Sequence, residues 1–167
     1  MEKNKNFNIL TLTAPDVENG LGCRVTIWCA GCSHHCPGCH NQHTWSYNQG
    51  KCIEDRNVIE SILKEAEKPY IKGITFSGGD PLDQSYEALQ QLERFIKIFK
   101  EELPGKDIWI YSGDVFEELI KTPVKRRILK KCDFLVDGPF IQELKDPDLP
   151  FRGSKNQRII NLSEKQF

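Results

Sequence analysis

The sequence predicts an α/β fold, specifically an incomplete (partial) βα barrel with a mostly parallel, curved sheet and a cysteine-rich loop after an early strand. Two observations lead to this prediction. Short apolar runs of β-type residues alternate with segments whose apolar residues recur at helical spacing, a pattern typical of parallel strands joined by right-handed crossovers. The chain of 167 residues is expected to form one domain, 1–167, with room for about five or six βα units, too few to close a barrel.

The first half of the chain contains three expected strands and two expected helices. Apolar runs bounded by turn-forming residues predict strands at 7–13, 23–28 and 71–76. A helix is expected from the N-cap residue Asp55 to the break at Pro69. The most strongly periodic helix covers 85–100, because its apolar residues lie on one face: Leu89, Leu92, Phe95, Ile96 and Phe99.

The second half continues the alternation. It predicts strands at 108–111, 134–136 and 158–162, and helices at 115–121 and 124–131. The cysteine loop, the Gly-Gly turn, Ser112-Gly113 and Asp137-Gly138 all directly follow strands. Ligand sites in parallel sheets lie outside the carboxyl ends of the strands. We therefore expect these four segments to converge on one rim of the sheet.

Cys32, Cys36 and Cys39 lie in one short loop and are the most informative residues in the chain. Three thiolates at the spacing C-x3-C-x2-C indicate ligands of one iron–sulfur cluster, which is normally held by four cysteines. With three protein ligands, one iron of a [4Fe-4S] cubane stays open to a small molecule. A cluster with an open iron is typical of radical chemistry on S-adenosylmethionine, so the loop predicts both cofactors.

A zinc site is the alternative interpretation of this loop, because Cys29 adds a fourth thiol and completes two C-x2-C pairs. Structural zinc sites usually have a longer segment between such pairs, whereas only three residues separate them here. Cys29 also ends the apolar run 25–28, where a cysteine serves as a small buried hydrophobe. The odd number of cysteines, seven, disfavours a disulfide scaffold, and Cys23, Cys52 and Cys132 lie apart from the loop.

The turn Ser77-Gly78-Gly79-Asp80-Pro81 is the second candidate element of a site. Its glycines place no side chain over the backbone, so a ligand can approach closely. Taken alone, the turn is better explained as an ordinary strand-to-helix connection. Its position beside the cysteine loop favours a role in cofactor binding. The ammonium group of a methionine moiety needs hydrogen-bond acceptors, and an exposed backbone edge supplies them.

The composition excludes several function classes. The charges nearly cancel, with 23 basic and 24 acidic residues, and no basic stripe predicts a nucleic-acid partner. The N-terminal residues are polar, no apolar stretch reaches the length of a signal peptide, and nothing approaches a membrane span. Because a loop of free thiols requires a reducing compartment, we expect a cytoplasmic protein with neither nucleic acid nor membrane as a partner.

The chain resembles the radical S-adenosylmethionine superfamily and, within it, the activating proteins of anaerobic (class III) ribonucleoside-triphosphate reductases. The cysteine spacing followed by Ser-Gly-Gly-Asp-Pro-Leu carries the resemblance to the superfamily. The narrower resemblance rests on the small size and on six segments that follow one another along nearly the whole chain: 19–24, 31–45, 104–109, 135–140, 144–147 and 152–157.

The resemblance implies an oxidoreductase that generates a glycyl radical on a protein substrate. S-adenosylmethionine would bind the open iron, and its reductive cleavage would give methionine and a 5′-deoxyadenosyl radical. That radical would take a hydrogen atom from a backbone glycine of anaerobic ribonucleoside-triphosphate reductase. A low-potential electron donor such as flavodoxin or ferredoxin is implied. The alternatives are an activase of another glycyl-radical enzyme, a radical enzyme for a small molecule, and a non-enzymatic zinc or electron-transfer module.

The resemblance also implies cofactor-binding positions outside the cysteine loop. The Gly-Gly-Asp turn matches the Gly-Gly-Glu of the superfamily, with a shorter acidic side chain. Ser112 and Asp137 match positions where relatives contact the cofactor carboxylate or ribose, although a turn hydroxyl and a helix-start carboxylate are equally good interpretations. Gly38 stands where many members have an aromatic residue against the adenine, so His40 is the candidate for that contact. No catalytic residue is expected beyond the cluster and the cofactor.

Overall fold

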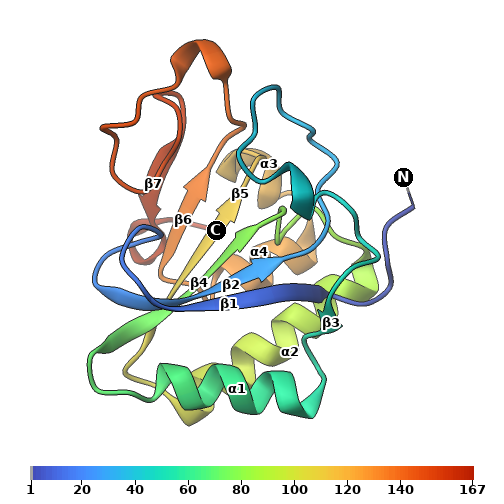
Figure 1. The fold of residues 1–167 in the computed structure, drawn as a ribbon, viewed down its shortest axis with the longest axis vertical. Coiled ribbons are helices and arrows are strands. Elements are labelled where there is room, and N and C mark those ends of the chain that lie inside the picture. Colours follow the sequence, from blue (N-terminus) through green and yellow to red (C-terminus); the bar gives the residue numbers. More distant parts are fainter. Residues whose placement is uncertain (1) are drawn as a thin grey trace.

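The computed structural model describes residues 2–167 and contains a seven-stranded sheet with the order β3-β1-β2-β4-β5-β6-β7 (Figure 1). The strands are β1 (Asn8–Asp16), β2 (Cys23–Cys29), β3 (Lys51–Cys52), β4 (Ile71–Gly78), β5 (Asp107–Ser112), β6 (Phe134–Asp137) and β7 (Arg158–Asn161). The sheet is open, with β3 and β7 at its edges. The α/β class is confirmed, while the curvature of a partial barrel stays a prediction.

Parallel pairing is confined to the four central strands, β2, β4, β5 and β6. The crossovers between them contain α1 (Arg56–Ala66), α2 (Tyr86–Glu102), and the pair α3 (Phe116–Leu119) and α4 (Pro123–Leu129). By contrast, β1 and β2 form an antiparallel hairpin, and the edge strands β3 and β7 are antiparallel to their neighbours. The sheet therefore has three crossovers between parallel strands, fewer than the five or six βα units for which the chain length leaves room.

The two long helices begin where the sequence predicts, because an N-cap side chain bonds to each first turn. The Asp55 carboxylate accepts a hydrogen bond from Asn57 N at 2.8 Å, and Ser85 Oγ accepts one from Ala88 N at 3.1 Å. α3 is shorter than expected because Pro123 starts α4 and the residue before a proline avoids helical geometry. No helix within residues 2–167 has the length and apolar character to cross a membrane.

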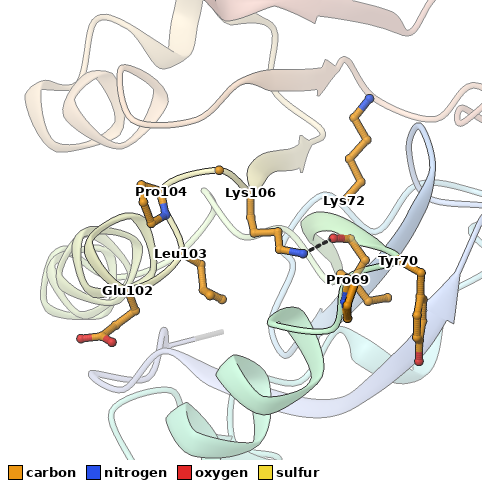
Figure 2. Close-up of a pocket in the computed structure, with 9 residues that line it drawn as sticks. Pro69, Tyr70, Lys72, Glu102, Leu103, Pro104 and Lys106 are labelled. Carbon is orange, nitrogen blue, oxygen red and sulfur yellow. Dashed lines mark hydrogen bonds between the residues drawn. The ribbon is translucent and has the colours of Figure 1, made fainter.

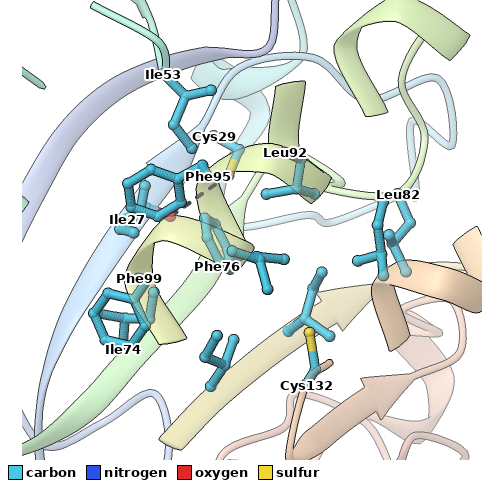
Figure 3. Close-up of a cluster of buried hydrophobic side chains, with 14 of the residues drawn as sticks. Ile27, Cys29, Ile53, Ile74, Phe76, Leu82, Leu92, Phe95, Phe99 and Cys132 are labelled. Atoms are coloured by element: carbon cyan, nitrogen blue, oxygen red, sulfur yellow. Dashed lines mark hydrogen bonds between the residues drawn. The ribbon is translucent and has the colours of Figure 1, made fainter. Parts of the chain in front are cut away.

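The hydrophobic core lies between the helices and the sheet (Figure 3). Phe76 of β4 is near its centre and makes edge-on contacts with Phe7 and Phe95, at 6.4 and 6.1 Å between ring centroids. Such aromatic pairs contribute about 0.5–1.5 kcal/mol each beyond the buried area. Cys29 and Cys132 are buried in this core, which confirms that Cys29 serves as a small apolar side chain.

The loop 138–157 packs over a polar and aromatic cluster outside this core. Trp109 of β5 meets Phe151 of the loop edge-on, with ring centroids 5.5 Å apart. The Arg24 side chain is fully buried, lies 5.5 Å from the Trp109 ring centroid and pairs with Asp107. Burial lowers the pKa of Arg24, although Asp107 favours the charged form. This packing fixes the loop that forms one wall of the site.

Candidate iron–sulfur centre and adjoining cavity

The segments that follow the central strands converge at one end of the sheet, which confirms the predicted rim. Figure 1 shows the loops 30–50 and 138–157 at the end toward which the central strands point. Ser112 of β5 pairs with Asp137 of β6, so these two strands end at the same level. A cavity of about 140 Å³ lies there. Its lining includes Cys32, His34, Cys36, Cys39, Gly78, Gly79, Asp80, Ser112, Gly113 and Gly138.

A second cavity, of about 440 Å³, adjoins the first. The two share a set of lining residues: Cys39, Asn41, Ser77, Tyr111, Phe140 and Gln157. Beyond these, the larger cavity is bounded by Trp28 of β2, by Arg152, and by Glu18 and Asn19 of the β1–β2 connection. The smaller cavity thus has three thiols among its lining residues, and the larger cavity lies beside it.

A cavity of about 520 Å³ lies at the opposite end of the sheet, before β4 and β5 begin (Figure 2). Tyr70 and Lys72 line one side of it. The Lys106 ammonium donates to the Lys68 carbonyl at 2.9 Å and to the Ile71 carbonyl, so its charge joins two loops. No thiol or imidazole is among the lining residues. The volume of a cavity therefore does not by itself identify the candidate metal site.

The cysteine loop is closed by backbone hydrogen bonds at its two ends. Gly31 N donates to Thr44 O at 2.7 Å, and Cys32 N donates to Trp45 O at 3.1 Å. Gly31 has a φ of 95°, which L side chains rarely adopt, and a Cβ there would meet the Tyr47 ring. The chain thus leaves β2 through a turn that only glycine fits, and the closed segment carries all three thiols.

Cys32, Cys36 and Cys39 are free, partly exposed thiols that line one cavity. This donor set fits a [4Fe-4S] cluster, because each thiolate binds a different iron and the sulfurs need not meet at one point. Burial, followed by the charge of Asp80, raises the pKa of Cys32 to about 12, so metal binding must displace its proton. Cys29 is fully buried in the core and does not line the cavity. A four-cysteine zinc site therefore lacks its fourth ligand there.

Gly78 and Gly79 permit close packing between the end of β4 and the cysteine loop. A Cβ on Gly79 would lie 2.4 Å from the Gly31 carbonyl oxygen, and one on Gly78 would lie 2.9 Å from Cys29 N. Gly79 N also donates to Cys29 O at 2.8 Å. The sequence suggests that these glycines leave room for a ligand. In the structure they first leave room for the neighbouring backbone, and both also line the smaller cavity.

The Asp80 carboxylate joins several segments of the site. It is 2% exposed, and its Oδ2 accepts hydrogen bonds from Ser112 Oγ at 3.0 Å and Gly113 N at 2.7 Å. The same oxygen lies 2.9 Å from His34 Nε2, and this hydrogen bond raises the pKa of His34. Oδ1 accepts from Leu82 N at 2.8 Å. The side chain expected to contact the cofactor thus holds the cavity walls together.

Asp83 and Gln84 support the cysteine loop, and no motif in the sequence points to them. The Asp83 Oδ2 atom accepts hydrogen bonds from Ser33 N at 2.7 Å, Ser33 Oγ at 2.6 Å and Tyr47 OH at 2.8 Å. Gln84 Nε2 donates to Ala30 O at 3.1 Å. Both residues lie within three positions of the end of the Gly-Gly-Asp-Pro turn, and that proximity is the one signal available in the sequence.

The remaining predicted positions, Ser112, His40 and Asp137, differ in their relation to the cavities. Ser112 lines the smaller cavity and His40 lines the larger one. Asp137 is fully buried and lines neither. Its carboxylate pairs with Arg158 and accepts a hydrogen bond from Phe116 N at 2.7 Å. Asp137 thus takes the other role that the sequence allows, at the start of a helix.

Tyr111, Phe140 and Gln157 line both cavities. The Phe140 ring meets the His40 ring edge-on, with centroids 6.2 Å apart. Gln157 Nε2 donates to the Gly138 carbonyl at 3.0 Å, which ties the two ends of the long loop together. None of the three stands out by residue type. Tyr111 ends an expected strand, and the other two lie in segments that carry the family resemblance.

Comparison with known proteins first gives the class of the protein. Residues 18–160 match a family described as a 4Fe-4S single cluster domain. This range contains all three cysteines of the loop and every residue that lines the two adjoining cavities. The match therefore supports an iron–sulfur cluster at the site that the geometry indicates.

Whole-chain similarity then gives the family. The chain is 43% identical to a protein of Haemophilus influenzae over 156 residues, which cover 92% of this chain and 97% of the relative. It is 39% identical to a protein of Escherichia coli K12, with 88% and 94% covered, and 37% identical to one of Enterobacteria phage T4, with 86% and 87% covered. All three relatives are named anaerobic ribonucleoside-triphosphate reductase-activating protein. The chain belongs to this family of activating proteins.

Proposed function

We propose that this protein is a radical S-adenosylmethionine activase, an oxidoreductase that generates a glycyl radical on anaerobic ribonucleoside-triphosphate reductase. The observation that carries the proposal is the set of three free thiols in one cavity beside a larger cavity. The names of the relatives support this reductase as the protein substrate. The 4Fe-4S family match supports the cluster.

Cys32, Cys36 and Cys39 are the proposed ligands of a [4Fe-4S] cluster with one iron free of protein ligands. When bound, the cluster supplies the electron for reductive cleavage of S-adenosylmethionine. The chain's own contribution is to fix the ligands. The loop is closed at Gly31, and the Asp83 carboxylate holds it through Ser33. Groups around the ligands that are themselves hydrogen-bonded tune and orient a metal site.

S-adenosylmethionine is proposed to span the two adjoining cavities, with its methionine end in the smaller one and its adenine in the larger one. The Gly79 carbonyl accepts no hydrogen bond from the described residues. We propose that it accepts a hydrogen bond from the methionine ammonium group, with Gly78 beside it. His40, together with Phe140, is proposed to contact the adenine, since Gly38 offers no aromatic ring. Asp80 and Ser112 are proposed to shape the methionine end, and Asp137 to act indirectly by fixing the end of β6.

A protein substrate suits this architecture. Few residues remain to build a closed pocket for a metabolite once the cluster loop and the cofactor cavity are formed, whereas a loop of a larger protein closes the site from outside. The electron is proposed to come from a low-potential donor such as flavodoxin or ferredoxin, in the cytoplasm. Without the reductase, the protein is expected to cleave the cofactor slowly, and this cleavage is not coupled to the formation of a glycyl radical.

The test mixes the anaerobically reconstituted protein with its reductase, S-adenosylmethionine and a strong reductant. We expect an EPR doublet from a glycyl radical on the reductase, absent when the cofactor is omitted or the target glycine is replaced by alanine. A radical formed on pyruvate formate-lyase and not on the reductase would point to the other activase. A colourless, zinc-loaded protein after reconstitution would reject the radical chemistry.

A further inference from the structure

The strand β1 has an unpaired edge beside the proposed site. On one side β1 pairs with β2 from Ile9 to Asp16. On the other side β3 pairs only with Asn8 and Ile9, and Figure 1 shows β3 at one end of β1. Within residues 2–167, no strand lies along the outer edge of β1 from Leu10 to Ala14. We call this stretch the open edge.

In the described part of the chain, the open edge lacks charged side chains and a covering strand, two of the features that usually prevent strand addition. Natural edge strands are protected by charged side chains, proline, bulges or a covering segment. Here the residues are Leu-Thr-Leu-Thr-Ala, with no charge, and Pro15 comes only after them. Thr11 and Thr13 are exposed, while Leu10 and Leu12 are half-buried. The pairing of β1 with β2 is irregular between Ile9 and Thr11 and again between Thr13 and Asp16, so the regular part of the edge runs from Thr11 to Thr13.

Cavities are present on the two faces of the open edge. One, of about 460 Å³, lies between β1 and α1 and is lined by Leu10, Leu12 and Val58 among others. Another, of about 280 Å³, is lined by Leu10 and Thr11 together with Trp28, Asn41 and His43. Side chains of an added strand point alternately to the two faces, so cavities on both faces suit recognition of a particular segment.

The open edge is continuous with the proposed cofactor site. Trp28 and Asn41 line the 280 Å³ cavity and also the 440 Å³ cavity, which includes Cys39. Trp28 is held at this junction because its Nε1 donates to Thr13 Oγ1 at 2.9 Å. Because β3 occupies the edge at Ile9, a segment paired with β1 near Leu10 would leave the edge over the 280 Å³ cavity, toward the cavity where the reaction is proposed to occur.

We propose that the open edge of β1 binds an extended segment of the reductase by strand addition, and that this segment carries the target glycine. The inference rests on the proposed function and adds the contact that delivers the substrate. A ladder of main-chain hydrogen bonds suits a substrate whose reacting atom is a backbone Cα without a side chain. The open edge is continuous with the cofactor cavity, and this favours the reductase segment as the occupant over a second copy of the chain. The reductase carries the reacting glycine, whereas a second copy does not need to reach the cluster.

Photo-crosslinking from the open edge tests the proposal. Benzoylphenylalanine replaces Thr11 in one variant and Lys97, on the exposed face of α2, in a matched control. Each variant is irradiated with the reductase, and cross-linked peptides are mapped by mass spectrometry. We expect a cross-link from position 11 to the peptide that contains the target glycine or adjoins it, and none to that peptide from position 97.

Three results would overturn the proposal: no cross-link at position 11, a cross-link to a second copy of this chain, or one to a reductase segment remote from the glycine. Wild-type protein is assayed for glycyl-radical formation in parallel. If it forms the radical while the cross-link fails, the open edge is excluded and the proposed function stands. If the wild-type protein forms no radical, the proposed function is rejected, and the strand-addition proposal that rests on it is rejected as well.

A kinetic variant provides a second measurement. Thr11→Lys introduces the kind of charge that protects natural edge strands, so we expect the apparent KM for the reductase to rise about tenfold, with iron content unchanged. Lys97→Ala is the control and should leave this KM unchanged. An unaltered KM in Thr11→Lys, with no cross-link from position 11, would exclude the open edge.

Discussion

The division of roles among the cysteines is the sharpest feature at the residue scale. Cys36→Ala is expected to abolish bound cluster and radical formation, because a site with three thiolates has no spare ligand. Cys29→Ala should retain both and cost about 1 kcal/mol of stability through a small cavity in the core. Iron and sulfide content after reconstitution measures the difference. Equal loss of iron in the two variants would restore the four-cysteine interpretation.

Asp83 is the buried acid whose charge matters most for the cysteine loop. Burial alone would raise the pKa of Asp83, but hydrogen bonds from Lys3, Ser33 and Tyr47 outweigh burial and lower it from 3.8 to about 2. A depressed pKa in the folded state stabilises the protein above the unfolded pKa. That stability is lost as the pH falls from about 4 to about 2.

Asp83→Asn should therefore reduce the free energy of unfolding by about 2 kcal/mol at neutral pH and flatten its dependence on pH between 4 and 2. Denaturant unfolding of the metal-free protein across this range provides the measurement. An unchanged slope in the variant would show that the carboxylate is not charged preferentially in the folded state.

At the scale of elements, the Asp137–Arg158 pair ties β6 to β7 and to the start of α3. Asp137 is fully buried, while Arg158 is about half exposed and also lies 2.8 Å from Glu117. Arg158→Met keeps most of the apolar stem but leaves a buried carboxylate without its counter-charge. We expect a loss of about 2 kcal/mol, less than for a fully buried pair because water screens the guanidinium.

The matched control is Arg56→Met, which removes an exposed ion pair with Glu60 inside α1 and should leave the denaturant midpoint close to that of the wild type. Denaturant midpoints of the two variants are compared with that of the wild type. If the two substitutions cost the same, the pair between β6 and β7 contributes no more than a surface pair.

The sequence predicts the long elements well and the short ones poorly. α1 and α2 follow from cap residues and helical periodicity, which are local properties. β3 has only two residues, and its pairing with β1 depends on where the cysteine loop returns, so no local pattern reveals it. The antiparallel pairing of β1 and β2 was not predicted, although the two expected strands follow each other with no helix between them.

The same limit applies to the site. Residues that directly follow strands are predictable, and the cysteine loop, the Gly-Gly turn and Ser112 do meet at one cavity. Side-chain direction is not predictable in this way. Asp137 lies at the expected level but turns toward Arg158, and Asp80 bonds to neighbouring loops. Asp83 depends on Tyr47, a partner 36 residues away in the sequence.

At the scale of the whole molecule, the fold places three features in succession. The central strands end at the cluster cavity, the larger cavity adjoins it, and the open edge of β1 leads to both through Trp28 and Asn41. In the proposed function, this arrangement presents the chemistry of a small protein toward a substrate that is itself a protein. The proposed function requires hydrogen-atom transfer between the bound cofactor and a backbone glycine of the partner.

Transfer of deuterium is the most direct test of that requirement. The reductase is prepared with deuterium at the target glycine and mixed with the reconstituted protein, reductant and S-adenosylmethionine, and the 5′-deoxyadenosine formed is analysed by mass spectrometry. We expect deuterium in the 5′-deoxyadenosine together with a glycyl EPR signal on the reductase. Full cleavage of the cofactor with unlabelled 5′-deoxyadenosine and an unmodified reductase would contradict the activase function.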